Sequence, residues 1–279
     1  MKLTLITACY DSGHYRDGLG KGPEAILASG IIDRLNASGH GVEIKDIGLV
    51  GESQGREIAT GFAVCRAVAA AVDIACSEQR FPVVLTGNCL TAAGAVAGER
   101  SKAIIWFDQH GDLNTPETSP YGFLDGMALA TTLGLCWRPM AASIPGFEPV
   151  DPSRCVLVDA RDLDADEIEL LEDLPVAQVA CEDLGKRLDD LFPTGKLRTH
   201  LHLDLDILDP DNIRVNRYAT KGGPSPETLG KALCDTARSL EISGLTISAY
   251  DPEFDPDNQV PMVVEHLLVD FLAAKEAIQ

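Results

Sequence analysis

Short apolar runs recur along this 279-residue chain, and segments with helical periodicity separate most of them. The run at residues 103–107 is apolar at every position rather than at alternate positions. Strands that alternate with helices and are buried on both faces form a parallel sheet covered by helices. We therefore predict an α/β protein with three layers, α/β/α, around a mostly parallel sheet of about eight strands. The predicted strands are residues 3–7, 42–47, 82–85, 103–107, 154–158, 177–180, 200–205 and 245–249.

The segments between these strands predict helices and one long loop. The sequence contains no linker, internal repeat or low-complexity tract, so we expect residues 1–279 to form a single domain. The loop at residues 111–126 is long for a compact domain, and such loops usually carry function. The predicted helices are residues 23–35, 54–78, 91–98, 164–171, 226–240 and 261–277.

Composition excludes several classes of protein. The net charge of −20 should repel phosphate backbones, so we expect no nucleic-acid partner. No segment approaches the roughly 18 consecutive apolar residues that a membrane helix needs. The first apolar run is also too short for the core of a signal peptide. The eight cysteines are scattered without a Cys-x-x-Cys pair, which is typical of a reduced protein. We expect a cytoplasmic protein that does not enter a membrane.

Three polar side chains, Asp108, His110 and Asp112, follow the apolar run 103–107 at alternate positions. In extended backbone, residues two apart point the same way, so these side chains should converge beyond the end of the strand. Ligands bind at that end of the strands in open α/β sheets. Carboxylates and an imidazole together suit manganese, iron or zinc, although a polar turn after a strand gives a similar pattern.

A second predicted strand carries Asp204 and Asp206 at alternate positions, with Leu203 and Leu205 on the opposite face. A parallel strand is normally buried on both faces. Burying two carboxylates together is costly unless a cation neutralises them. The pair therefore favours a metal site at the same edge of the sheet.

The segment 83–94 has the pattern of a strand, a tight turn at Gly87 and the start of a helix. Cys89 follows this turn, where its side chain would face the same edge of the sheet as the carboxylates.

Taken together, four segments resemble the arginase (ureohydrolase) family in order and spacing from about residue 20 onward. Segment 106–116 resembles the family's Asp-x-His-x-Asp motif, and segment 200–210 resembles its Asp-x-Asp motif. Segment 22–26 resembles an early Gly-Pro motif, and segment 248–256 resembles a late segment that carries a substrate-binding Glu. The resemblance implies an arginase-like hydrolase that cleaves a C–N bond of a small guanidino-type molecule, and it suggests a homo-oligomer.

The resemblance also implies two Mn²⁺ ions per chain. Asp108 and Asp204 would bridge the two ions, Asp112 would complete one site, and His110 and Asp206 would complete the other. The full ligand set implied in this way is Cys89, Asp108, His110, Asp112, Asp204 and Asp206.

Residues around the metals receive roles from the same resemblance. Glu253 would orient the substrate carbon over the metals, and Asp112 would relay a proton to the leaving amine. Asn114 would help to hold the carboxylate end of the substrate, and Asp164 would hold its α-amino group. An ordinary helix N-terminus is an equally good interpretation of Asp164.

Two departures from the family pattern bear on the substrate. Cys89 stands where most members have a ligating His, although the subgroup that includes an Nω-hydroxy-L-arginine amidinohydrolase uses Cys. The thiol of Cys89 either ligates a metal or only packs in the core. Asp125 stands where arginases have a His used in proton transfer, and an Asp can replace it as a catalytic residue only if its pKa is strongly raised.

The resemblance implies a guanidino or N-hydroxyguanidino amino acid as substrate, and these two departures argue against plain arginine within that class. Nω-Hydroxy-L-arginine is the preferred candidate, because an N-hydroxyguanidine is less basic than a guanidine. Two alternatives remain open. One is a hydrolase of formimidoyl or other guanidino acids, and the other is a metal-binding regulatory protein that has lost catalysis.

Overall fold

The computed structural model describes residues 1–51, 57–193 and 197–277. Its centre is a parallel sheet of eight strands in the order β4-β1-β5-β10-β9-β6-β7-β8. All eight predicted strands are present, and the predicted α/β fold is confirmed. The strands are β1 (Lys2–Ala8), β4 (Gly41–Asp46), β5 (Phe81–Thr86), β6 (Ala103–Phe107), β7 (Cys155–Val158), β8 (Ala177–Val179), β9 (Thr199–Asp204) and β10 (Ile242–Ser248). A separate hairpin pairs β2 (Tyr10–Asp11) with β3 (His14–Tyr15).

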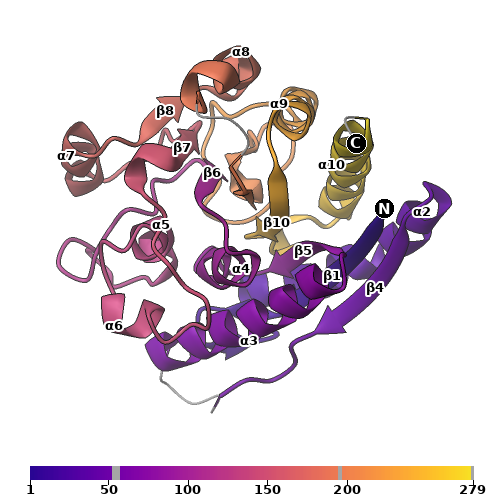
Figure 1. The fold of residues 1–279 in the computed structure, drawn as a ribbon, viewed down its shortest axis with the longest axis horizontal. Coiled ribbons are helices and arrows are strands. Elements are labelled where there is room, and N and C mark those ends of the chain that lie inside the picture. The colour runs from indigo at the N-terminus through magenta and orange to yellow at the C-terminus, as the bar shows by residue number, and fades with distance from the viewer. Residues whose placement is uncertain (52–56, 194–196, 278–279) are drawn as a thin grey trace.

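Helices cover both faces of the sheet and give three layers (Figure 1). The core on one face includes side chains from α1 (Gly22–Ala28), α2 (Ile31–Ala37), α8 (Cys181–Leu191), α9 (Pro226–Ser239) and α10 (Gln259–Glu276). The core on the other face includes side chains from α3 (Glu57–Ser77), α4 (Thr91–Glu99), α5 (Ala128–Thr132), α6 (Arg138–Ala141) and α7 (Ala165–Asp173).

The predicted helix 23–35 is two helices in the structure. Gly30 separates α1 from α2 and adopts a φ of 92°, a left-handed conformation that glycine accepts readily. The chain changes direction there, so a continuous helical periodicity does not require a continuous helix. The predicted start of the helix 54–78 lies partly outside the described residues, and α3 is described from Glu57.

Helix α3 is long and apolar enough to meet the length and composition criteria for a membrane span, contrary to the sequence expectation. In the structure, 56% of the most apolar 18-residue stretch of this helix is buried, and the helix packs against α4 and β1. This packing is that of a core helix.

The contact between α3 and α4 requires small side chains. Every residue of α4 is buried. A Cβ at Gly94 would lie 2.4 Å from the backbone oxygen of Cys65, and one at Gly98 would lie 2.5 Å from that of Ala69. Both distances are shorter than van der Waals contact, so the two helices can approach this closely only with glycine at these positions.

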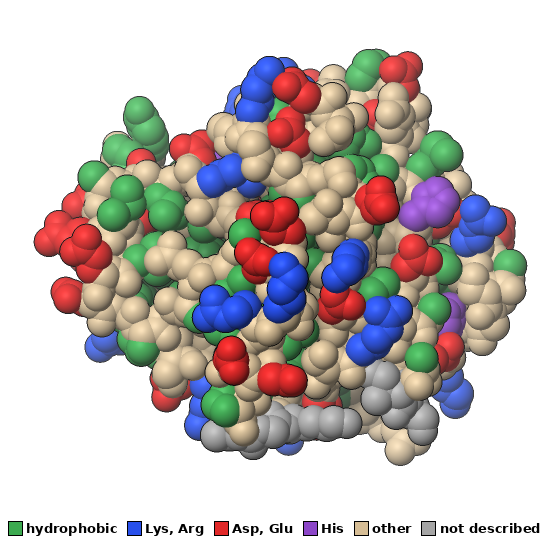
Figure 2. All heavy atoms as spheres, turned by 90° about the horizontal axis from the view of Figure 1, so that it is seen from above, with side chains coloured by type: hydrophobic (Ala, Val, Ile, Leu, Met, Phe, Trp, Pro, Cys, Tyr) green, Lys and Arg blue, Asp and Glu red, His purple; other side chains and the backbone are tan. Residues whose placement is uncertain are grey.

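The net negative charge does not gather into a single patch on the face seen in Figure 2. Acidic side chains are spread across that face, and lysine and arginine side chains lie among them. Four acids, Asp108, Asp112, Asp204 and Asp206, are instead buried at the carboxyl edge of the central strands.

Replacing Gly94 with Ala should destabilise the fold by about 1–3 kcal/mol, because the added methyl group meets backbone rather than a movable side chain. Chemical denaturation of wild type and variant measures this difference. Gly41→Ala is the matched control, since a Cβ there meets nothing within 4 Å. Equal losses in the two variants would contradict the close-packing argument.

Candidate metal centre

The acidic side chains meet because β6 and β9 are neighbours in the sheet. The register pairs Phe107 with Leu203, which places Asp108 beside Asp204 at the ends of the two strands. Short turns then bring the following residues to the same edge. The amide of His110 donates to Asp108 Oδ1 at 2.7 Å, and the amide of Asp206 donates to Asp204 Oδ1 at 2.8 Å.

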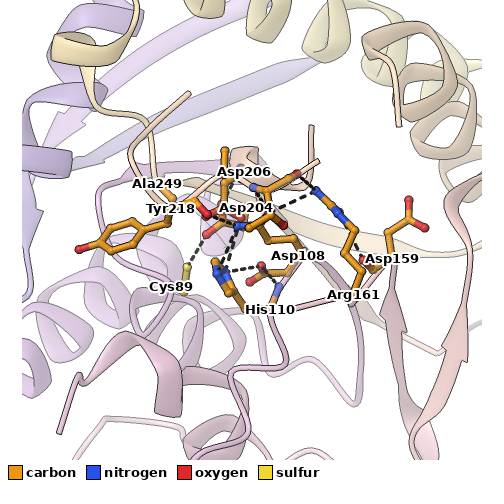
Figure 3. Close-up of polar contacts among 12 residues, drawn as sticks. Cys89, Asp108, His110, Asp159, Arg161, Asp204, Asp206, Tyr218 and Ala249 are labelled. Carbon is orange, nitrogen blue, oxygen red and sulfur yellow. Dashed lines mark hydrogen bonds and ion pairs between the residues drawn. The ribbon is translucent and has the colours of Figure 1, made fainter. Parts of the chain in front are cut away.

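Two groups of side chains at this edge could each hold a metal ion. In each group the possible ligand atoms all lie within 4.8 Å of one another. In Figure 3, Cys89 points toward Asp204, and His110 lies near Asp108 and Asp206. The first group is Cys89, Asp108, His202 and Asp204, and the second is Asp108, His110 and Asp206. Asp108 belongs to both groups, as a bridging ligand would.

Burial makes this cluster unfavourable without a compensating charge. Burial, reinforced by neighbouring carboxylates, raises the pKa of Asp112 and Asp204 well above the usual range. Burial also raises the pKa of Asp206, to about 6, and His110 opposes this rise. In His110 itself, burial alone would lower the pKa, but the Asp206 and Asp108 carboxylates raise it to about 10.

Several buried polar atoms at this edge lack a hydrogen-bond partner among the described residues. They include Asp112 Oδ2, Asp206 Oδ1 and both ring nitrogens of His202. Buried polar groups are nearly always paired, so each such atom requires an explanation. Carboxylate, imidazole and thiol groups are metal donors, and the residues present fit a pair of divalent cations.

Cys89 is 5% exposed, and its Sγ lies 2.9 Å from Asp204 Oδ2 and 3.3 Å from Ser248 Oγ. Burial, followed by the charge of Asp204, raises the pKa of the thiol well above its usual range. In a site without cations the thiol therefore keeps its proton and can donate it to Asp204. Only a bound cation would stabilise the thiolate form here.

A cavity of about 260 Å³ opens above these groups. Its wall includes Asn114, Asp125, Asp164 and Tyr218 in addition to several of the predicted ligands. Among the described residues that line it, seven are acidic and none is lysine or arginine. Such a lining favours a ligand that carries positive charge.

The comparison with known proteins agrees with this geometry. The arginase family matches residues 1–273. The chain belongs to the arginase family. It is 32% identical to an arginase of Bacillus caldovelox, with 98% of each chain covered. The structure of an arginase from Bacillus subtilis superposes with a TM-score of 0.88 at 28% identity, covering 98% of each chain. A proclavaminate amidino hydrolase from Streptomyces clavuligerus shares only the fold, with a TM-score of 0.74 at 17% identity and 100% and 93% coverage.

Within this arginase-family cavity, Asn114 and Asp164 lie together on one wall. Asn114 Nδ2 donates to Asp164 Oδ2 at 2.8 Å. Asp164 is also the N-cap of α7, and its amide donates to Glu167 Oε2 at 2.9 Å. Glu167 Oε1 accepts from the amide of Leu113 at 2.8 Å and so ties the motif loop to α7. Helix capping and exposure to the cavity are therefore compatible roles for Asp164.

The structure does not place Glu253 in the cavity, which corrects the sequence expectation for this residue. After β10 the chain turns at Ala249, which has a φ of 66°, and enters the 3₁₀ helix η5 (Pro252–Phe254). The side chain of Glu253 is 67% exposed and its Oε1 lies 2.7 Å from Lys21 Nζ. Ala249, and not Glu253, lines the cavity.

Asp125 lines the cavity from the start of the 3₁₀ helix η2 (Asp125–Met127). Asn88 Nδ2 donates to Asp125 Oδ2, and the amide of Leu90 lies 3.4 Å from Asp125 Oδ1. Burial raises the pKa of Asp125 to about 7, although the bond from Asn88 opposes the shift. The condition under which an Asp can carry a proton near neutral pH is therefore met in the metal-free protein.

Sequence reasoning missed two residues that organise this centre. His202 lies two positions before Asp204 and so shares its face of β9. The alternating pattern of the strand could therefore have predicted that His202 faces the same side as the acids. Gln109 gives no such local signal. Its Oε1 accepts from the amide of Thr220 at 2.8 Å, and its Nε2 donates to the carbonyl of Tyr218 at 2.9 Å. Gln109 thereby fixes the loop that forms the wall of the cavity at Tyr218.

Adding Mn²⁺ to metal-depleted protein should stabilise it, by about 2.7 kcal/mol per site at 100 times the dissociation constant. Asp108→Ala removes the acid common to both groups and should abolish most of this gain. Asp73→Ala is the matched control, because Asp73 is an exposed acid on α3. Unfolding of all three proteins with and without Mn²⁺ measures the effect. An undiminished gain in Asp108→Ala would refute the assignment of the centre.

Proposed function

We propose that this protein is a binuclear-metal hydrolase that cleaves a C–N bond of a guanidino or N-hydroxyguanidino amino acid. The observation that carries the proposal is the pair of ligand groups that share Asp108 beneath an acidic cavity. Membership of the arginase family supports the reaction class. Two Mn²⁺ ions, the metal that the family resemblance implies, would neutralise the carboxylates and activate water for attack on the amidine carbon.

We assign the cavity residues to two parts of the substrate, the reacting group and the amino-acid end. Asp112 and Asp125 lie at the reacting end, where a proton must reach the leaving amine. Asn114 and Asp164 lie on the wall, where they would hold the amino-acid end of the substrate. The acidic wall favours the α-ammonium group, and the amide of Asn114 can donate to the α-carboxylate.

We prefer Nω-hydroxy-L-arginine as substrate because the segment after β10 gives the reacting end of the cavity no carboxylate that could bind a guanidinium cation. Ala249 presents no carboxylate to a guanidinium cation, and Glu253 is directed to the surface. An N-hydroxyguanidine is less basic and can bind as the neutral form without such a partner. A thiolate at Cys89 would add a further negative charge, which disfavours inhibitory ligation by the hydroxyl of this substrate.

A panel of substrates tests the proposal. With Mn²⁺ present, Nω-hydroxy-L-arginine should give hydroxyurea with a higher kcat/KM than arginine or agmatine gives urea. A formimidoyl amino acid, which would give formamide, represents the alternative hydrolase. Faster hydrolysis of arginine would contradict the preference for the hydroxyguanidine. The absence of turnover with every compound, in protein that binds metal, would favour the regulatory alternative.

The pH dependence of kcat tests the role of Asp125. Its pKa of about 7 means that the carboxyl loses its proton as the pH rises through this value, and bound cations would lower the value. If Asp125 donates a proton, kcat should fall on the alkaline side, and Asp125→Asn should remove this limb and reduce kcat by about 10²-fold or more. Asp125→His should restore proton delivery. If the pH dependence of kcat is unchanged in Asp125→Asn, Asp125 does not donate the proton and serves only as a hydrogen-bond partner of Asn88.

A further inference from the structure

His202 occupies an unusual place in the strand β9. Its side chain is fully buried, and neither ring nitrogen has a hydrogen-bond partner among the described residues. The ring stacks on Trp106 of β6, with ring centroids 3.7 Å apart and an interplanar angle of 26°. The same indole donates from Nε1 to Asp108 Oδ2 at 3.1 Å, so Trp106 contacts both His202 and an acid of the candidate metal centre.

The neighbouring histidine on the same face shows what the fold provides for a structural imidazole. His200 Nδ1 lies 2.9 Å from Glu99 Oε1, and its Nε2 lies 2.9 Å from Thr246 Oγ1. Both nitrogens of His200 are therefore paired. A buried imidazole with neither nitrogen paired loses about 1–3 kcal/mol for each unsatisfied group, so His202 requires a partner that the protein itself does not supply.

The missing partner coincides with the first group of possible ligands. A nitrogen of His202 lies within 4.8 Å of the donor atoms of Cys89, Asp108 and Asp204, so one cation could reach all four side chains. We propose that His202 is a metal ligand, and that the Cys89 site is formed by a thiolate, an imidazole and two carboxylates. This inference rests on the proposed function only in requiring a metal at the centre.

The donor set of this site differs from that of its neighbour. Sulfur and nitrogen donors favour softer ions such as Zn²⁺, Co²⁺ or Fe²⁺, whereas the group of Asp108, His110 and Asp206 offers mainly oxygen and suits Mn²⁺. The two sites should therefore differ in metal preference. Asp112 lies outside both groups but lines the same cavity, and its Oδ2 is buried without a hydrogen-bond partner among the described residues.

Cobalt titration of the metal-depleted full-length protein tests the inference, because a thiolate bound to Co²⁺ gives a charge-transfer absorption band. Wild type should show this band with the first equivalent of Co²⁺. His202→Gln should weaken Co²⁺ binding at the site that gives the band by at least about tenfold, the scale that even outer-shell changes reach. His110→Gln is the matched comparison, since it changes the other group and should leave the band in place.

The outcomes separate the two proposals. If wild type binds no divalent cation, the metal centre itself fails. If wild type gives the band and His202→Gln gives the same band with the same affinity, the centre stands and His202 is not a ligand. Should His202→Gln fail to fold, histidine ¹⁵N NMR of the wild-type Zn²⁺ form decides. Metal-dependent shifts of both His110 and His202 support ligation, and a shift of His110 alone overturns it.

Discussion

Buried negative charge at one edge of the sheet is the constraint on which the rest of the structure depends. Asp108, Asp204 and Asp206 lie at the ends of two adjacent strands, and Asp112 faces the same cavity. Their hydrogen bonds come from backbone amides and uncharged side chains. His110 lies 3.4 Å from Asp108 and 3.6 Å from Asp206, and no lysine or arginine in the described chain pairs with any of the four acids. One histidine cannot balance four buried acids, so the fold fixes the acids in position but leaves most of their charge for bound cations to neutralise.

The parallel register builds this centre in layers. At the end of β9, Asp204 lies beside Ser248 of β10. Two residues earlier in the same strand, His202 lies between Trp106 of β6 and Thr246 of β10. These polar residues lie on a face that α4 covers. Because α4 is short and composed largely of small residues, it can pack closely over them and hold the turn that carries Cys89 at the edge. The same small residues that let α4 pack closely therefore also place Cys89 at the edge of the sheet.

The sequence predicts the layers of this fold well because fully apolar strands have few alternatives. It also locates Asp108 and Asp204, since strand ends in a parallel sheet share one edge. Glu253 could not be placed in this way. Its position depends on the left-handed turn at Ala249 and on a partner, Lys21, that is distant in the sequence. His202 lies on the right face in the sequence, but only the three-dimensional structure reveals that its nitrogens lack partners.

The departures from the family pattern make chemical sense when they are taken together. A thiolate at Cys89 and an imidazole from His202 would donate more electron density to one cation and so weaken its activation of water. Asp125, whose pKa rises to about 7 through burial, can supply a proton where arginases use His. Ala249 lines the cavity without a carboxylate, so a cationic guanidinium would gain no ionic partner from this residue. Together these features support the proposal of a less basic amidine as substrate, because such a group can bind in its neutral form without a carboxylate partner at the reacting carbon.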